Sequence, residues 1–210
     1  MAKLKAPLMS LGASGALGKA LVFFPWKGID CVREYVIPSN PDTTLQSTHR
    51  AYLTEAVAKI HELQALPASE LDETDQSAYA AWGSTFPTPR TWFNQAVKNW
   101  IDVVRAGKGP IIYYHGNMEM TTATDARMQI YCGEKVVGTL VAAKAHLGTS
   151  KTNLNQTRDF TVIAGVAMNI AAGDQFTGLT VGKKYYWQAR PITADPAEKA
   201  WSGIYSFIAT

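Results

Sequence analysis

The glycine-rich stretch near the N-terminus is the first place where residue types and spacing could do chemistry. Gly12, Gly15 and Gly18 recur at intervals of three and are followed by Lys19. A phosphate-binding loop needs Gly, four residues, then Gly-Lys and Ser or Thr, all after a strand. Here Ala20 follows the lysine, and no strand is expected before the glycines. A flexible arm, or a turn before a strand, explains this stretch better than nucleotide binding.

The sequence contains no stronger motif for metal binding or for acid–base catalysis. His49 and His61 lie on a predicted helix, and neither has a second ligand four residues further on. A run of acids fits the solvated first turn of a helix, because no His or Cys accompanies it; its members are Glu70, Asp72, Glu73 and Asp75. The acids of the C-terminal half fit turns and strand ends, since they form no calcium loop; they are Asp125, Glu134, Asp159 and Asp174.

The chain also lacks the sequence patterns of known hydrolases. It contains no H-E-x-x-H, no G-x-S-x-G and no paired cysteines, and His115 and His146 are isolated. We therefore predict a non-enzymatic protein with no cofactor and no metal. Catalytic groups can converge only in the fold, so an enzyme that acts on the cell wall stays as an alternative.

Composition favours contacts with other proteins. Of 210 residues only 18% are charged, while six are Trp, nine Tyr and seven Phe. Aromatic anchors are enriched in protein interfaces and charges are depleted from their cores. The alternative is that the aromatics fill two small cores. The net charge of +3 is scattered, so no nucleic-acid partner is expected.

The location of the protein is predicted from its cysteines and its apolar runs. Cys31 and Cys132 are far apart, which favours two free thiols in a reducing compartment over a disulfide. Residues 6–17 are too rich in Gly and Ser for a convincing signal peptide, and no run is long enough to span a membrane. We expect synthesis in a cytoplasm.

The elements that must position these residues divide the chain in two. Residues 1–18 are expected to be a flexible arm, and two β-prone runs, 20–24 and 31–37, form a hairpin. Three amphipathic helices are expected to follow, beginning with Asn40-Pro41, Ser69 with Asp72, and Thr88-Pro89, and closing at about Gln64, Gly83 and Gly107. Together they predict an α+β unit over residues 1–108.

Residues 109–210 change to short strand-like runs separated by turn residues. An antiparallel β-sandwich fits that spacing. The predicted strands are 111–115, 127–132, 135–142, 160–166, 184–192 and 204–209.

The segment from Gly178 to Arg190 resembles the end of a fibronectin type III domain. Leu179 precedes Tyr185 by six residues, as in that family, where the tyrosine hydroxyl ties back to the backbone. The resemblance implies an immunoglobulin-like sandwich, although Val181 replaces the usual proline and no tryptophan marks the second strand. Alternation then places Tyr185, Trp187 and Ala189 in the core, and Tyr186, Gln188 and Arg190 outside.

Residues 15–105 resemble a module of uncharacterised proteins from bacteriophages and prophage-bearing genomes. The matching residues are Trp26-Lys27-Gly28, Val32-Arg33, Asn40-Pro41, Thr43 or Thr44, Gln46, Arg50, Ala81-Trp82 and 91–94. This resemblance implies a structural protein of the virion, in a capsid, tail or appendage, whose partners are other copies of itself and other virion proteins.

Four aromatic residues are the predicted subunit contact, because the hairpin offers β edges and exposed rings. They are Phe23, Phe24, Trp26 and Tyr35, and the alternative places them in the internal core. A second function stays open, a host-surface adhesin in which Tyr113, Tyr114 and Tyr186 would stack on glycans.

Overall fold

The computed structural model describes residues 3–4, 13–37, 43–68, 70–163, 167–193 and 195–210. The chain forms two compact units, residues 1–43 and residues 44–210.

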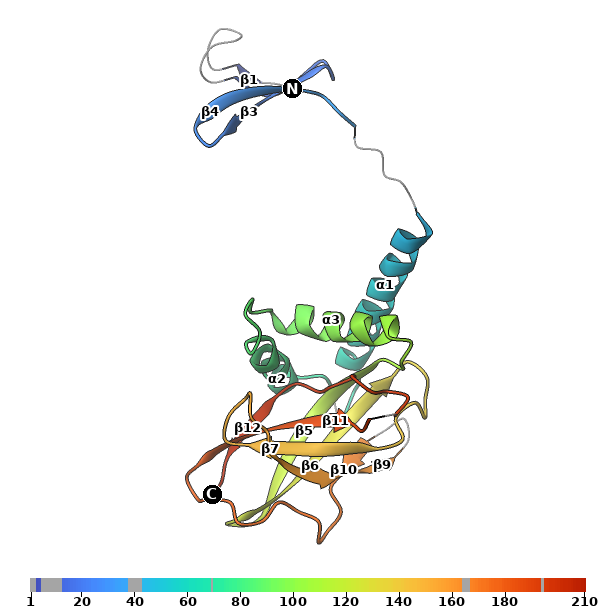
Figure 1. Cartoon of the computed structure of the whole chain (residues 1–210), viewed down its shortest axis with the longest axis vertical. Helices are drawn as coiled ribbons and strands as arrows, with labels where there is room; N and C mark the ends of the chain where they lie inside the picture. Colours follow the sequence, from blue (N-terminus) through green and yellow to red (C-terminus); the bar gives the residue numbers. More distant parts are fainter. Residues whose placement is uncertain (1–2, 5–12, 38–42, 69, 164–166, 194) are drawn as a thin grey trace. The chain divides into compact units, whose positions relative to one another are not determined.

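The N-terminal unit is a four-stranded antiparallel sheet with its strands in sequence order (Figure 1). Its strands are β1 (Lys3–Leu4), β2 (Ala13–Leu17), β3 (Leu21–Trp26) and β4 (Ile29–Glu34). The predicted hairpin is confirmed as β3 and β4. Its turn is only Lys27 and Gly28, which both have positive φ, as the tight turns that suit twisted strands require.

The predicted flexible arm is wrong for residues 13–17, which form β2 and pair with β3. Gly18 and Lys19 both have positive φ and make the turn between these strands, closed by a hydrogen bond from Ala20 N to Leu17 O. The glycine spacing therefore serves a turn before a strand. Gly12 lies outside the described residues, as do Asn40 and Pro41.

The C-terminal unit begins with three helices, α1 (Thr44–Gln64), α2 (Glu73–Gly83) and α3 (Trp92–Arg105). Asp72 caps α2 and exchanges hydrogen bonds with Asp75, so the capping box lies three residues after the predicted one; Ser69 is outside the described residues. Thr91 caps α3 in place of Thr88, because its hydroxyl accepts a hydrogen bond from Asn94 N.

Two four-stranded antiparallel sheets follow and form the predicted sandwich (Figure 1). One has the order β5-β6-β10-β9 and the other β12-β11-β7-β8. The strands are β5 (Ile111–Thr122), β6 (Asp125–Glu134), β7 (Ala143–Gly148), β8 (Gln156–Asp159), β9 (Thr161–Ile163), β10 (Ala167–Asn169), β11 (Lys184–Pro191) and β12 (Tyr205–Ile208).

The predicted strand over residues 135–142 is wrong, because that segment is a loop ahead of β7. The Glu134 carboxylate accepts hydrogen bonds from the backbone N–H groups of Thr139 and Leu140. The Asp195 carboxylate accepts those of the next two residues, 141 and 142. Four backbone donors thus bond to side chains and not to a neighbouring strand. This valine-containing run has the apolar pattern of a β-strand, and that pattern led to the wrong prediction.

Helices and sandwich share one of the two hydrophobic cores of this unit. One core fills the space between the sheets, and the other joins the helices to Ile112, Tyr114 and Ile204 of the strand region. The predicted domain boundary falls between residues 108 and 109, whereas the compact units divide between 43 and 44. The difference arises because the helices bury their apolar faces against the sandwich.

The segment from Gly178 to Arg190 contains a hydrogen bond between a tyrosine hydroxyl and the backbone, as its resemblance implies. Leu179, Tyr185 and Trp187 are buried, and the Tyr185 hydroxyl accepts a hydrogen bond from Thr180 N at 2.9 Å. Gln188, expected outside, is fully buried. Its amide nitrogen donates to Ser202 O at 2.6 Å, so a backbone partner replaces solvent.

Gly203 packs directly against the backbone of α2 at Ala78. A Cβ built at residue 203 would lie 2.6 Å from the backbone carbon of Ala78. At Gly133 the nearest atom, at 2.7 Å, belongs instead to the movable side chain of Leu63. We expect Gly203→Ala to destabilise the protein by about 2–3 kcal/mol in urea unfolding, and Gly133→Ala by less. Equal effects of the two substitutions would contradict this packing.

Candidate interaction surface

The N-terminal sheet has two distinct faces, defined by its register. Residues directly opposite each other in antiparallel strands point to the same face. Phe23 pairs with Val32 and Leu21 with Leu17, whereas Trp26 pairs with Ile29 and Phe24 with Cys31. We call the first the Phe23 face, made of Leu17, Leu21, Phe23, Val32 and Glu34. The second is the Trp26 face, made of Val22, Phe24, Trp26, Ile29, Cys31 and Arg33.

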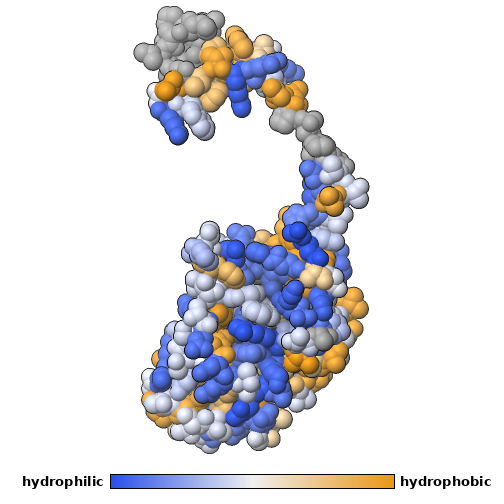
Figure 2. Space-filling model, in the orientation of Figure 1, coloured by the Kyte–Doolittle hydropathy of each residue, from blue (hydrophilic) through white to orange (hydrophobic). Residues whose placement is uncertain are grey.

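Both faces expose large apolar side chains. Figure 2 shows apolar residues beside polar ones on the visible side of this unit. On the Trp26 face, Trp26 is 61% exposed and Ile29 67%. On the Phe23 face, Val32 is 48% exposed and Leu17 41%, while Phe23 itself is buried. In the strands of a sheet that buries only one face, apolar and polar residues alternate. Here both sets of alternate positions are mostly apolar, with Glu34 on one face and Arg33 on the other.

The four predicted contact residues are thus divided by the sheet. Phe24 and Trp26 share a face, and the Arg33 guanidinium lies 5.3 Å from the centre of the Phe24 ring. Phe23 points to the opposite face. Tyr35 is half-buried just beyond β4, and its N–H donates to Ala20 O. Ile29 and Val32 were missed as contact candidates, although the lack of a polar alternation across 21–32 signals them.

A unit of 43 residues is close to the size limit of independently stable domains. Domains near or below about 40 residues usually need disulfides, metals or association, and small sheets need a covered apolar face. Cys31 is a free thiol. The exposed faces of this sheet are therefore a candidate surface for a partner.

The most connected polar cluster lies in the other unit, around Asp75. This carboxylate is fully buried and accepts hydrogen bonds from His115 N at 2.7 Å, Gly116 N at 3.1 Å and the Tyr205 hydroxyl at 2.7 Å. Asp72 N donates a fourth. Burial raises the pKa of Asp75, while the hydrogen bonds act in the opposite direction.

This cluster fixes the shape of β5. The strand has a bulge between Tyr114 and Asn117, and His115 there has a positive φ of 48°. Asp75 holds the two bulge N–H groups. A bulge adds one residue and so exchanges the faces of the positions that follow. Tyr113 before it and Met118 after it consequently both contribute to the sandwich core.

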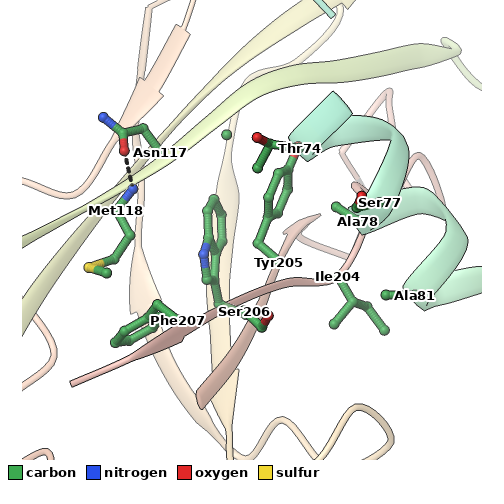
Figure 3. Close-up of a pocket in the computed structure, with 12 residues that line it drawn as sticks. Thr74, Ser77, Ala78, Ala81, Asn117, Met118, Ile204, Tyr205, Ser206 and Phe207 are labelled. Carbon is green, nitrogen blue, oxygen red and sulfur yellow. Dashed lines mark hydrogen bonds between the residues drawn. The ribbon is translucent and has the colours of Figure 1, made fainter. Parts of the chain in front are cut away.

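A pocket of about 300 Å³ lies next to this cluster, between α2, β5 and β12 (Figure 3). Hydroxyl, amide and apolar groups line it, among them Thr74, Ser77, Asn117, Met118 and Phe207. Asn117 Oδ1 accepts a hydrogen bond from Met118 N at 2.8 Å. The hydroxyl of Tyr205, the one ionisable group of the lining, donates a hydrogen bond to Asp75. The lining contains no pair of acid and base.

A polar groove of about 310 Å³ lies on the outer face of β5, β6 and β10. Asn117, Gln129 and Asn169 are in register across the three strands. In the next row, Arg127 Nη2 donates to Glu119 at 2.7 Å. Arg127 Nε is buried without a hydrogen-bond partner among the described residues.

The tyrosines predicted to stack on glycans are placed elsewhere. Tyr113 and Tyr114 are buried, one in each core. Tyr186 is half-buried and packs against the core shared with the helices. The structure therefore provides no exposed platform from Tyr113 and Tyr114, because both rings fill the interior.

Comparison with known proteins adds no family to this description. No family model, curated protein or solved structure matches the chain. Among the residues that the structure describes, no group of three or more His, Cys, Asp or Glu is placed to hold a metal ion. No helix within the described ranges is long and apolar enough to cross a membrane.

The two cysteines are expected to differ strongly in reactivity. Burial raises the pKa of Cys132 to about 12, whereas Cys31 is half-buried in the N-terminal sheet. Only the thiolate alkylates. With iodoacetamide at pH 8, and the protein diluted until it is unassociated, intact-mass spectrometry should find one label on the folded protein and two in urea. Two labels added at equal rates without denaturant would contradict this placement.

Proposed function

We propose that this chain is a non-enzymatic structural protein of a bacteriophage particle, in a capsid, tail or appendage. Its N-terminal sheet contacts neighbouring subunits, and its helix-and-sandwich unit, residues 44–210, is the larger of the two compact units. The observation that carries the proposal is the exposure of Trp26, Ile29 and Val32 on opposite faces of one small sheet.

Two further observations support this proposal. The sequence of residues 15–105 resembles a phage-associated module, which favours a virion over other assemblies. The buried carboxylates Asp75 and Asp195 are used internally, since both accept hydrogen bonds from the backbone. Such satisfied groups stabilise a fold, which favours a structural role for these two acids.

The test combines particle composition with solution mass. Peptide mass spectrometry of particles purified from the phage or lysogen that encodes the chain should detect it at a fixed ratio to the other virion proteins. Sedimentation velocity of the purified chain should give masses above the 22.9 kDa of one copy. A monomer at every concentration that is also missing from the particles would overturn the proposal.

Glycan binding is a second candidate function, and the polar groove on β5, β6 and β10 favours it. Amide side chains in a row both donate and accept hydrogen bonds, as sugar hydroxyls require. An array of bacterial surface glycans should then show binding that Gln129→Ala reduces and Val136→Ala, in an exposed loop, does not. An array without binding removes this candidate.

A further inference from the structure

We infer that the N-terminal sheets of successive copies stack head to tail, with the Phe23 face of one copy on the Trp26 face of the next. The inference rests on the proposed function and specifies its partner as a second copy of this chain and its geometry as heterologous. Such contacts form a ring if the rotation closes and a filament if it does not.

Both faces of the N-terminal sheet expose apolar side chains that a partner would shield from water. A closed dimer uses one face of each sheet and leaves the other in water. If two Phe23 faces met, Trp26 and Ile29 would stay exposed at 61% and 67%. If two Trp26 faces met, Leu17 and Val32 would stay exposed instead. Head-to-tail stacking covers both faces of every internal copy.

The two faces also differ in the sign of their charge. Among the strand residues with described side chains, Glu34 is the charged residue of the Phe23 face and Arg33 that of the Trp26 face. Contact between like faces places equal charges together, which is unfavourable. Contact between unlike faces brings Glu34 of one copy towards Arg33 of the next. The two charges occupy neighbouring positions at the same end of β4.

Each face also offers two exposed apolar side chains. They are Leu17 and Val32, 41% and 48% exposed, on the Phe23 face, and Trp26 and Ile29, 61% and 67% exposed, on the Trp26 face. Phe23 itself is buried and lies opposite Val32. Stacked sheets pack about 10 Å apart with interdigitating side chains, and these exposed pairs supply such a layer.

The test uses one variant for each face of the full-length chain. Leu21→Thr with Val32→Thr alters the Phe23 face, and Trp26→Thr with Ile29→Thr alters the Trp26 face. Threonine keeps strand propensity. Far-UV circular dichroism and urea unfolding confirm that each variant folds. Native mass spectrometry then measures each variant alone and an equimolar mixture.

Head-to-tail stacking predicts a wild type larger than a dimer, two monomeric variants, and a 1:1 heterodimer in the mixture that grows no further. The heterodimer forms because each variant supplies the face that the other lacks. If one variant forms homodimers and the mixture no heterodimer, the stacking is overturned while self-assembly stands. If wild type and variants are all monomers, the stacking and self-association both fail.

Discussion

Replacing Asp75 by alanine is expected to destabilise the helix-and-sandwich unit by about 3–5 kcal/mol, because it leaves several buried donors without an acceptor. Those donors are the N–H groups of Asp72, His115 and Gly116 and the hydroxyl of Tyr205. Loss of this magnitude is a large part of the stability of a domain. Urea unfolding followed by tryptophan fluorescence measures it.

Matched variants separate the cluster from a general effect of helix charge. Glu73→Ala removes an exposed acid from the first turn of the same helix and should cost about 1 kcal/mol or less. Tyr205→Phe removes one donor, so its effect should be smaller than that of Asp75→Ala and not additive with it. If Asp75→Ala does not fold, Asp75→Asn takes its place in the measurement. This substitution keeps the volume of the side chain but replaces one hydrogen-bond acceptor by a donor. An Asp75→Ala effect no larger than that of Glu73→Ala would refute the structural role.

Substituting Trp26 and Ile29 together by threonine is expected to weaken self-association about 100- to 10,000-fold. Each large apolar side chain buried at an interface contributes about 1.5–3 kcal/mol, and 1.4 kcal/mol is a factor of ten. The two residues are directly opposite each other on the Trp26 face, so the change removes one contiguous patch. Sedimentation velocity over a dilution series measures the shift in the dissociation constant.

The control for this prediction removes similar surface elsewhere. Val136 and Val137 are 65% and 76% exposed in the loop before β7, within the other unit. Their double replacement by threonine should leave the association unchanged. Equal weakening by both pairs would indicate a nonspecific loss of apolar surface, and no weakening by either would remove Trp26 and Ile29 from the contact.

Local signals in the sequence were sufficient for much of the fold. The 3.6-residue period predicts the three helices, and the β-prone runs on either side of Gly28 predict the β3–β4 hairpin, since both depend on neighbours in the chain. The caps at Asp72 and Thr91 differ from the predicted ones. The six-residue spacing of Leu179 and Tyr185 likewise identified a buried strand.

Features set by distant residues were not predictable in this way. The β5 strand was expected to end at His115, but Asp75 holds a bulge there and the strand continues to Thr122. Glu134 and Asp195 likewise turn residues 139–142 into a loop. The subunit contact stays a prediction, and its aromatic residues were recognised individually from the sequence. The pairing that assigns Phe23 and Trp26 to opposite faces comes only from the register.

Hydrogen–deuterium exchange of the full-length wild type over a dilution series tests the intermolecular role of the N-terminal sheet most directly. Peptides that cover β3 and β4 should exchange slowly at high concentration and faster on dilution, while peptides from β5 to β12 keep the same rates. Exchange in residues 21–34 that does not change with concentration would show that no second copy covers this sheet, and would contradict the account.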